Sequence, residues 1–302
     1  IAEFVIYVNM LTWPIAAVGW VTSLVQRAAA SQARINEFLN IVPEITNSNM
    51  GSSDIHGNIE FQNVTFDYPD SGICALNNVS FSVQQGKSLA IMGRTGSGKS
   101  TIANLIGRIY DISNGDILID KTPIDKINLD DLRSNIGYVP QEVFLFSETI
   151  ANNISFGLTE IDVSKKTIEE AAKNAAIYNN IMEFPDRFET FVGERGITLS
   201  GGQKQRISIA RAIIRSPQIL IFDDCLSSVD TETEEEILNN LKIILQDKTS
   251  IIISHRVSSV KHADHIIILD EGRVAEEGKH AYLIDKKGIY FDLFKKQQLE
   301  NS

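Results

Sequence analysis

The chain has 302 residues, of which 43% are hydrophobic and 22% charged, and its formal net charge is −11. This composition excludes a disordered or fibrous protein, and the negative charge argues against a protein that grips nucleic acid through clustered Lys and Arg. Only Cys74 and Cys225 are present, and their spacing indicates neither a metal site nor a disulfide framework. The first residue is Ile and no signal-peptide pattern follows, so we expect a piece of a longer protein.

The first predicted element is an apolar segment over residues 4–25, which contains no charged side chain. A helix of this length rises about 33 Å, enough to cross the hydrocarbon core of a bilayer. Arg27 and Arg34 follow, as is typical of a cytoplasmic flank, and residues 28–39 continue as an amphipathic helix. We therefore expect residues 1–39 to be the end of a transmembrane domain. The alternative is a buried helix of a soluble protein.

Residues 40–56 contain Pro43 and many small polar side chains, which predicts a linker. After Gly57, apolar runs typical of strands alternate with helical stretches, the pattern of an α/β domain over residues 57–302. The runs at residues 89–92, 219–222, 250–253 and 266–269 are continuous, as in a parallel sheet covered on both faces. Residues 142–215 are largely helical in character.

The strongest motif is GRTGSGKS at residues 93–100, which matches the phosphate-loop pattern G-x-x-x-x-G-K-[ST]. A buried strand precedes it and a helix is predicted over residues 101–110. Glycine backbone amides and the helix N-terminus would face the phosphates, Lys99 would reach the β- and γ-phosphates, and the Ser100 hydroxyl would bind Mg²⁺. The predicted nucleotide-binding residues are Gly93, Arg94, Thr95, Gly96, Ser97, Gly98, Lys99, Ser100 and Thr101.

A carboxylate for the same metal is predicted at the end of the apolar run over residues 219–222. Asp223 follows this run directly, so its side chain would emerge beside the phosphate loop. There it could hold Mg²⁺ through water. ATP and Mg²⁺ are the expected ligands.

A second glycine-rich string, LSGGQKQR at residues 199–206, resembles the signature motif of ABC-type ATPases. It precedes a helix predicted over residues 207–215, so it is another helix N-terminus able to bind an anion. In that family, the equivalents of Ser200, Gly201, Gly202 and Gln203 contact the nucleotide that is bound by the partner subunit.

The remaining parts of the ABC pattern follow in family order. Tyr68 resembles the aromatic residue on which adenine stacks, and Gln141 resembles the switch glutamine that contacts Mg²⁺ and the attacking water beside the membrane domain. Asp230 resembles the acidic end of the dimer-contact loop, and His255 resembles the switch histidine that touches the γ-phosphate. Residues 193–196 resemble an exporter loop that senses the membrane domain.

The resemblance implies an ABC exporter half with fused membrane and ATPase domains. The implied fold is an α/β P-loop NTPase with a RecA-like parallel-sheet core, an antiparallel β subdomain and an α-helical subdomain, preceded by a partial transmembrane helix. The implied activity is ATP hydrolysis that powers export, with the ATPase domain on the cytoplasmic side of a bacterial inner or plasma membrane. Partners would be its own upstream transmembrane domain, the lipid bilayer and a second half-transporter, but no nucleic acid; the cargo is not visible in this sequence.

One residue departs from the family pattern. The family places Glu after the metal-binding Asp as the general base, whereas this chain has Asp224. Losing one methylene retracts the carboxylate, and a misplacement of about 1 Å can cost on the order of 10²-fold in rate. Because the signature is intact, we expect this chain to supply the weaker ATP site of a heterodimer. The alternatives are a homodimer with Asp224 as a working base and a non-transport ABC ATPase.

Overall fold

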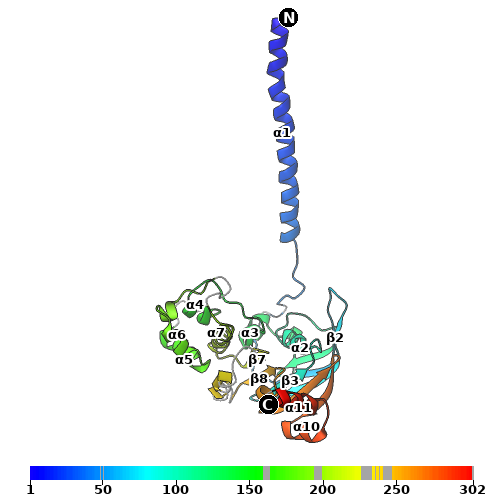
Figure 1. Ribbon diagram of the computed structural model, residues 1–302. Helices are drawn as coiled ribbons and strands as arrows, with labels where there is room; N and C mark the ends of the chain where they lie inside the picture. The colour runs from blue at the N-terminus through cyan, green and yellow to red at the C-terminus, as the bar shows by residue number, and fades with distance from the viewer. Residues whose placement is uncertain are drawn as a thin grey trace. The chain divides into compact units, whose positions relative to one another are not determined.

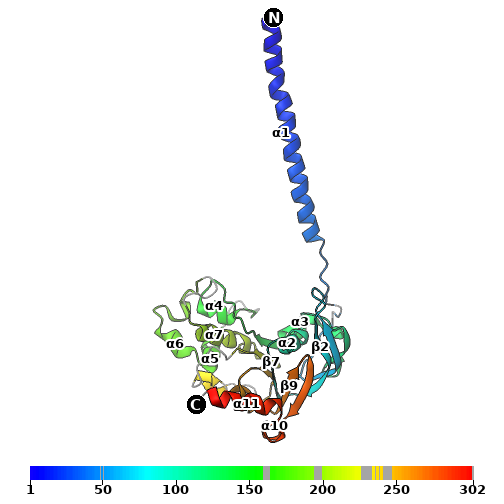
Figure 2. The same cartoon turned by 45° about the vertical axis from the view of Figure 1, so that its right-hand side comes forward.

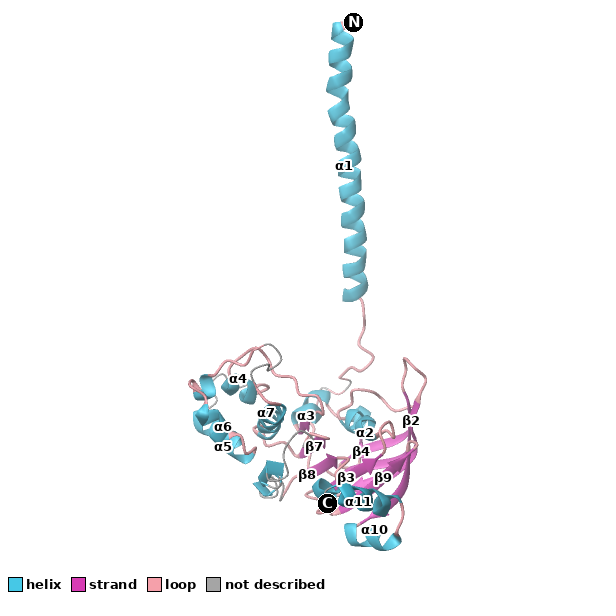
Figure 3. Cartoon of the chain, viewed as in Figure 1, coloured by secondary structure: helices cyan, strands magenta, loops and turns pink. Residues whose placement is uncertain are grey.

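The computed structural model describes residues 1–47, 49, 51–158, 164–193, 199–225, 233–234, 236–237, 239–240 and 247–300. The chain divides into two compact units, Ile1–Thr46 and Asn47–Ser302 (Figure 1). The second unit contains all the strands that the structure describes, drawn in magenta in Figure 3.

The first unit is built on one helix, α1 (Ala2–Leu39), which continues without a break through Pro14. The hydroxyls of Thr12 and Thr22 donate to the carbonyls four residues earlier, at 3.0 and 2.8 Å. These polar groups are therefore satisfied within the helix, as an apolar environment requires. By length and composition α1 could cross a membrane, and none of its side chains is buried. The predicted N-terminal apolar helix is confirmed.

The larger sheet of the second unit has six strands in the order β10-β9-β3-β8-β7-β6. All neighbours are parallel except β9 and β10, which form an antiparallel pair. The predicted parallel-sheet core is thus confirmed, and its four continuous apolar runs are strands. The strands are β3 (Ser88–Gly93), β6 (Ile136–Val139), β7 (Ile219–Asp223), β8 (Thr249–Ile253), β9 (His265–Asp270) and β10 (Arg273–Gly278).

The register of this sheet brings distant residues to one edge. Ile91 pairs with Ile253, and Ile253 pairs with Asp223. Because parallel strands end at the same edge, the residues that follow β3, β7 and β8 gather there. These are the phosphate loop, Asp224 and His255.

The smaller sheet is antiparallel, with the order β2-β1-β4-β5. Residues 59–67 form one strand, β1, whose pairing with β2 is irregular around Asn63 (φ 51°). Rings of Phe61 and Phe81 stack at 4.4 Å between β1 and β2. The strands are β1 (Ile59–Asp67), β2 (Cys74–Val83), β4 (Asn114–Ile119) and β5 (Thr122–Pro123).

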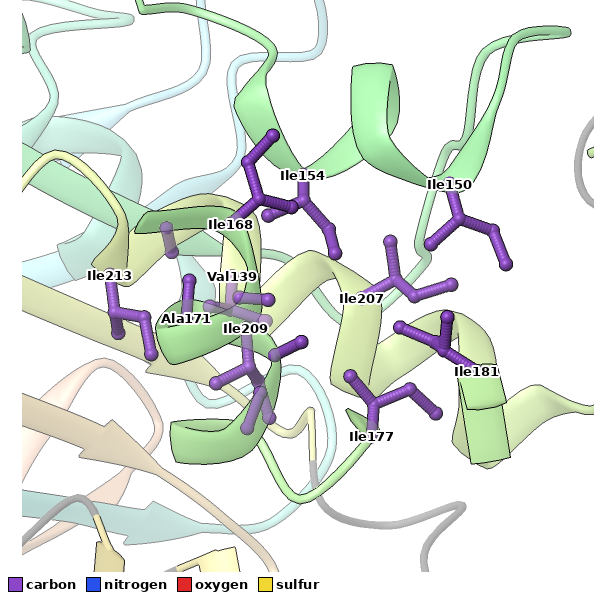
Figure 4. Packing of buried hydrophobic residues seen from close by; sticks show 14 of the residues in the cluster. Val139, Ile150, Ile154, Ile168, Ala171, Ile177, Ile181, Ile207, Ile209 and Ile213 are labelled. Atoms are coloured by element: carbon purple, nitrogen blue, oxygen red, sulfur yellow. The ribbon is translucent and has the colours of Figure 1, made fainter. Parts of the chain in front are cut away.

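Helices α4 (Ile150–Ser155), α5 (Lys165–Asn174), α6 (Tyr178–Glu183) and α7 (Gly201–Ile213) form the predicted helical region. They gather on one side of the unit in both views (Figures 1 and 2). Their buried apolar side chains interdigitate around α7, as Figure 4 shows for Ile154, Ile168, Ile177 and Ile207. This packing holds the start of α7 in place.

Two predicted helix boundaries were wrong. The helix after the phosphate loop, α2 (Lys99–Ile106), begins inside the loop itself and ends before Gly107. Helix α7 begins at Gly201 rather than at residue 207, because Ser200 caps it. Shorter helices are α3 (Leu129–Ser134), α9 (Val257–Val260) and α10 (His280–Lys286), and the last is α11 (Ile289–Glu300); single 3-10 turns are η1 (Ile124–Lys126) and η2 (Arg187–Glu189).

A set of hydrogen bonds, which we name the linker clasp, fixes the described residues between Asn47 and Asn58 to the rest of the second unit. The Asn128 side-chain amide donates to the carbonyls of Asn49 and Gly51, at 2.9 and 3.1 Å, while its oxygen caps α3. The Asp120 carboxylate accepts bonds from the backbone amides of residues 56, 57 and 58, at 2.7, 3.2 and 2.9 Å. The clasp also includes Asn47, Ser53 and Asp131.

Asp120 should make the stability of the clasp depend on pH. Burial alone would raise the pKa of Asp120, but bonds from His56, Asn58 and Gly57 outweigh it and lower the pKa. Such a carboxylate stabilises the fold above its unfolded pKa, near 3.9, and loses this effect as pH falls through the folded pKa. We expect Asp120→Asn to lower the free energy of unfolding by about 1 kcal/mol at pH 7 and by less at about pH 2.

Urea denaturation followed by circular dichroism at both pH values measures this difference. Asp116→Asn, at an exposed carboxylate on β4, is the control. An equal loss at both pH values would contradict the prediction.

Candidate nucleotide site

The phosphate loop joins β3 to α2, and its backbone requires glycine at two points. Gly93 and Gly98 have φ values of 152° and 96°. A Cβ on Gly93 would lie 2.2 Å from the Leu269 carbonyl oxygen, and one on Gly98 would lie 2.5 Å from that of Ala75. Larger residues therefore cannot occupy these positions, and the loop stays folded against the sheet with bare backbone at its turns.

Lys99, the first residue of α2, is only 7% exposed. Its ammonium donates to the carbonyl oxygens of Gly93 and Arg94, at 3.0 and 2.8 Å, so it lies under the curve of the loop. Burial lowers the pKa of Lys99, and the carboxylates of Asp224 and Asp223 act in the opposite direction. The loop thus encloses a cation.

Asp223 ends β7 and is 3% exposed. It accepts hydrogen bonds from the hydroxyls of Ser100 and Tyr138, at 3.1 and 3.2 Å. Burial raises the pKa of Asp223, and these two bonds oppose that rise. The Ser100 hydroxyl and the Asp223 carboxylate are adjacent hard oxygen donors, the ligand type that Mg²⁺ prefers. The residues present therefore fit a magnesium ion.

Asp224 follows β7 in a left-handed conformation, with φ 44°. Its backbone amide donates to the Ile253 carbonyl at 2.8 Å, so this unusual backbone is fixed to β8. Its carboxylate acts electrostatically on both Lys99 and His255, which places all three in one site.

His255 lies two residues beyond β8, with its side chain exposed. Partial burial and the Lys99 ammonium lower the pKa of His255, and Asp224 and Asp223 oppose that effect. The imidazole is therefore largely neutral at pH 7. It is within electrostatic reach of Lys99 in the phosphate loop.

Gln141 and Tyr68 approach the site from two other elements. Gln141 is exposed two residues after β6, the neighbour of β7, so it lies at the same sheet edge as Asp223. The Tyr68 hydroxyl bonds to that of Thr101 in α2 at 2.9 Å. Its ring packs edge-on against Phe66 and Tyr110, with centroids 4.9 and 5.5 Å away. Tyr68 is thus held beside the phosphate loop.

The signature residues form a separate helix start. The Ser200 hydroxyl accepts from the Gln203 amide at 3.2 Å, and the Gln203 side chain accepts from the Ser200 amide at 2.9 Å. This capping box leaves Ser200 and Gly201 exposed at the N-terminus of α7. Within the described residues, no hydrogen bond or ion pair joins Ser200–Gln203 to the phosphate loop.

Some predicted residues lie outside the described part of the chain. Asp230 and the rest of the predicted dimer-contact loop are among them, as is most of the predicted exporter loop after Gly193.

The sequence interpretation missed one polar group at the site, the Tyr138 hydroxyl, whereas Ser97 was among the predicted nucleotide-binding residues. Tyr138 carries a hydroxyl into the sheet, and burial together with the Asp223 carboxylate raises the pKa of Tyr138 well above its usual value. It therefore stays a hydrogen-bond donor at neutral pH. The Ser97 hydroxyl is buried with no hydrogen-bond partner in the described chain. The available signal for Tyr138 was its place in the short apolar run before Pro140.

The strand, phosphate loop and helix, with Ser100 and Asp223 adjacent, define a P-loop nucleotide-binding domain. Residues 76–227, about half of the chain, match the family described as "ABC transporter". The chain therefore belongs to the ABC transporter family.

Several relatives resemble the chain over nearly all of its length. It is 41% identical over 99% of its residues to the multidrug resistance-like ATP-binding protein MdlA of Escherichia coli. It is 44% identical over 97% to the uncharacterized ABC transporter ATP-binding protein YknU of Bacillus subtilis. It is 41% identical over 97% to the ATP-dependent lipid A-core flippase of Haemophilus influenzae. The chain spans 50% of each of these relatives.

A solved structure, that of a bacterial Atm1-family ABC exporter with ATP bound, is 37% identical with a TM-score of 0.87. The match covers 97% of this chain and 51% of that one. At this identity and coverage, the ABC ATPase fold with its N-terminal apolar helix is established for the chain.

Proposed function

We propose that this chain is the ATPase part of an ABC exporter, in which ATP binding and hydrolysis power transport across a membrane. The observation that carries the proposal is the phosphate loop with Lys99 enclosed beneath it and Ser100 bonded to Asp223. The matches to transporter relatives and to the exporter structure, each over nearly the whole of this chain, support it. The cargo is left open, because half of each relative lies outside this chain.

Each residue has a proposed role in the reaction. The loop amides and Lys99 would bind the β- and γ-phosphates, and Ser100 and Asp223 would hold the metal, with Gln141 beside them. Bound Mg²⁺ would offset the negative charge of the phosphate oxygens. Asp224 would orient the attacking water and accept its proton, and neutral His255 would contact the γ-phosphate.

We further propose that the transporter is a heterodimer in which this chain supplies the weaker site. The intact capping box at Ser200 supports a working signature for the partner's nucleotide. The shorter Asp224 carboxylate supports slow hydrolysis at this chain's own loop. A homodimer with Asp224 as base is the second candidate, because Asp224 lies within electrostatic reach of Lys99 and His255.

An aromatic surface near Gln141 supports the upstream transmembrane domain as a partner. Phe144 and Phe156 are each 52% exposed, and their rings lie 5.1 and 4.3 Å from that of Phe146. Exposed aromatic clusters of this kind mark protein contacts. With the apolar helix α1, this surface supports a protein anchored in a bacterial cell membrane, with its ATPase domain in the cytoplasm.

The heterodimer proposal predicts the effect of lengthening one carboxylate. We expect Asp224→Glu to raise ATP hydrolysis by the assembled transporter about twofold, because a second site of similar rate joins the first. The measurement is steady-state phosphate release by the full-length protein reconstituted with the half-transporter encoded beside it. Asp224→Asn should change the rate by less than about twofold. Brisk hydrolysis by a homodimer of this chain, abolished by Asp224→Asn, would contradict the proposal.

A further inference from the structure

The turn that carries His255 is held by the C-terminal helix α11. The Gln297 side-chain amide donates to the His255 carbonyl at 2.5 Å, and its oxygen accepts from the Val257 amide at 2.8 Å. One side chain, forty residues further along the chain, therefore fixes the peptide groups on both sides of Arg256.

Other contacts hold the flanks of the same turn. The Ser254 amide donates to the Ile91 carbonyl at 3.2 Å, which joins the turn to β3. Glu234, only 2% exposed, bonds to Arg256 at 3.0 Å and accepts from the hydroxyls of Ser258 and Ser259. These contacts fix the residues on both sides of His255. The bond from Gln297 therefore sets the orientation of the His255 carbonyl itself.

Helix α11, which carries Gln297, is itself held in place by hydrogen bonds and packing. Tyr290 is fully buried and its hydroxyl bonds to His280 at 2.7 Å. The Glu276 carboxylate accepts from the amides of Ile289 and Tyr290, at 2.9 and 3.1 Å. Leu293 and Phe294 pack in the same cluster as Val257 and Val260 of α9. Gln297, one turn after these residues, is therefore held in place.

We propose that Gln297 is a positioning residue, which aims His255 at the terminal phosphate of the nucleotide. The proposal rests on the proposed function of His255. Two hydrogen bonds from one rigid amide define the backbone direction at His255, and its imidazole projects from that backbone. Because contacts to a phosphate weaken steeply with small displacements, loss of Gln297 should weaken the γ-phosphate contact and leave the α- and β-phosphate contacts unchanged.

The test compares ATP with ADP at this chain's own site. The full-length protein, assembled with its partner, is photolabelled with 8-azido-ATP, the two chains are separated on a gel, and ATP or ADP is used to displace the label. We expect Gln297→Met, similar in volume, to raise the ATP concentration for half-displacement about 3–10-fold and to change that for ADP less than twofold. Gln297→Glu, which sets a carboxylate against the His255 carbonyl, should do the same. Lys296→Met, on the same helix, is the matched control.

A double variant separates positioning from general stability. If Gln297 acts through His255, Gln297→Met combined with His255→Ala should bind ATP no more weakly than His255→Ala alone. Equal weakening of ATP and ADP, an unchanged ATP value, or additive losses in the double variant would each overturn the proposal. Failure of the unaltered chain to label at all would instead remove the nucleotide site, and this inference with it.

Discussion

Lys99→Ala is expected to weaken Mg-ATP binding at this chain's own site by at least about 100-fold. The ammonium lies under the phosphate loop, bonded to two loop carbonyls, and is almost wholly buried. Removing it takes away the one side-chain cation enclosed by the described loop and leaves those carbonyls without their donor. Truncating one partner of a buried, charged hydrogen-bond pair costs about 2–5 kcal/mol, and 100-fold corresponds to about 2.7 kcal/mol.

Displacement of bound 8-azido-ATP from this chain, in the assembled full-length protein, measures the change. Lys261→Ala, which removes an exposed cation near α9, should leave binding within about twofold. Thermal unfolding of each variant shows whether the fold persists. If Lys99→Ala binds Mg-ATP as tightly as the unaltered chain, the nucleotide site proposed here is wrong.

Ser200→Arg is expected to lower ATP hydrolysis by the assembled transporter by roughly 100-fold, far more than Asp224→Asn. The Ser200 hydroxyl caps α7 and stands at an exposed helix N-terminus, where positive peptide dipoles attract an anion. An arginine there would fill the space in which we propose that the partner's nucleotide binds. Loss of the cap alone costs only about 1 kcal/mol, so the rate should fall much more than the stability.

The chain offers a matched control for this substitution. Ser164 caps α5 in the same way, accepting from the Thr167 amide at 3.1 Å. Ser164→Arg should lower stability to a similar extent and change hydrolysis by less than about twofold. Displacement of 8-azido-ATP from this chain's own loop should be unchanged by Ser200→Arg. Equal losses of activity in the two variants would show that the cap serves only the fold.

The fold and the phosphate loop could be predicted because their signals are local. A continuous apolar run identifies a strand such as β3 or β7 without any knowledge of its neighbours, and the loop motif fixes its own backbone. Strand order could not be predicted, since β3 lies between β8 and β9, which follow it by more than 150 residues. The start of α7 was predicted too far along the chain, because its first turn contains glycine, a weak helix former.

The missed contacts at the site share a physical cause. Tyr138 and Asp223 are 85 residues apart, and Gln297 and His255 are 42 apart. Each pairing depends on how whole elements pack. Neither the tyrosine nor the glutamine belongs to a motif of fixed spacing from which its partner could be predicted. Asp224, by contrast, was proposed from the resemblance to the ABC family, which places its general base directly after the metal-binding Asp.

The linker clasp limits how far α1 and the ATPase unit can move apart. Among the described residues, hydrogen bonds to the rest of the second unit begin at Asn47, so the connection after α1 is residues 40–46. Seven residues span at most about 25 Å when fully extended, against about 60 Å for the whole stretch to residue 56. Because this connection is short, a displacement of the ATPase unit beyond that reach would pull directly on α1.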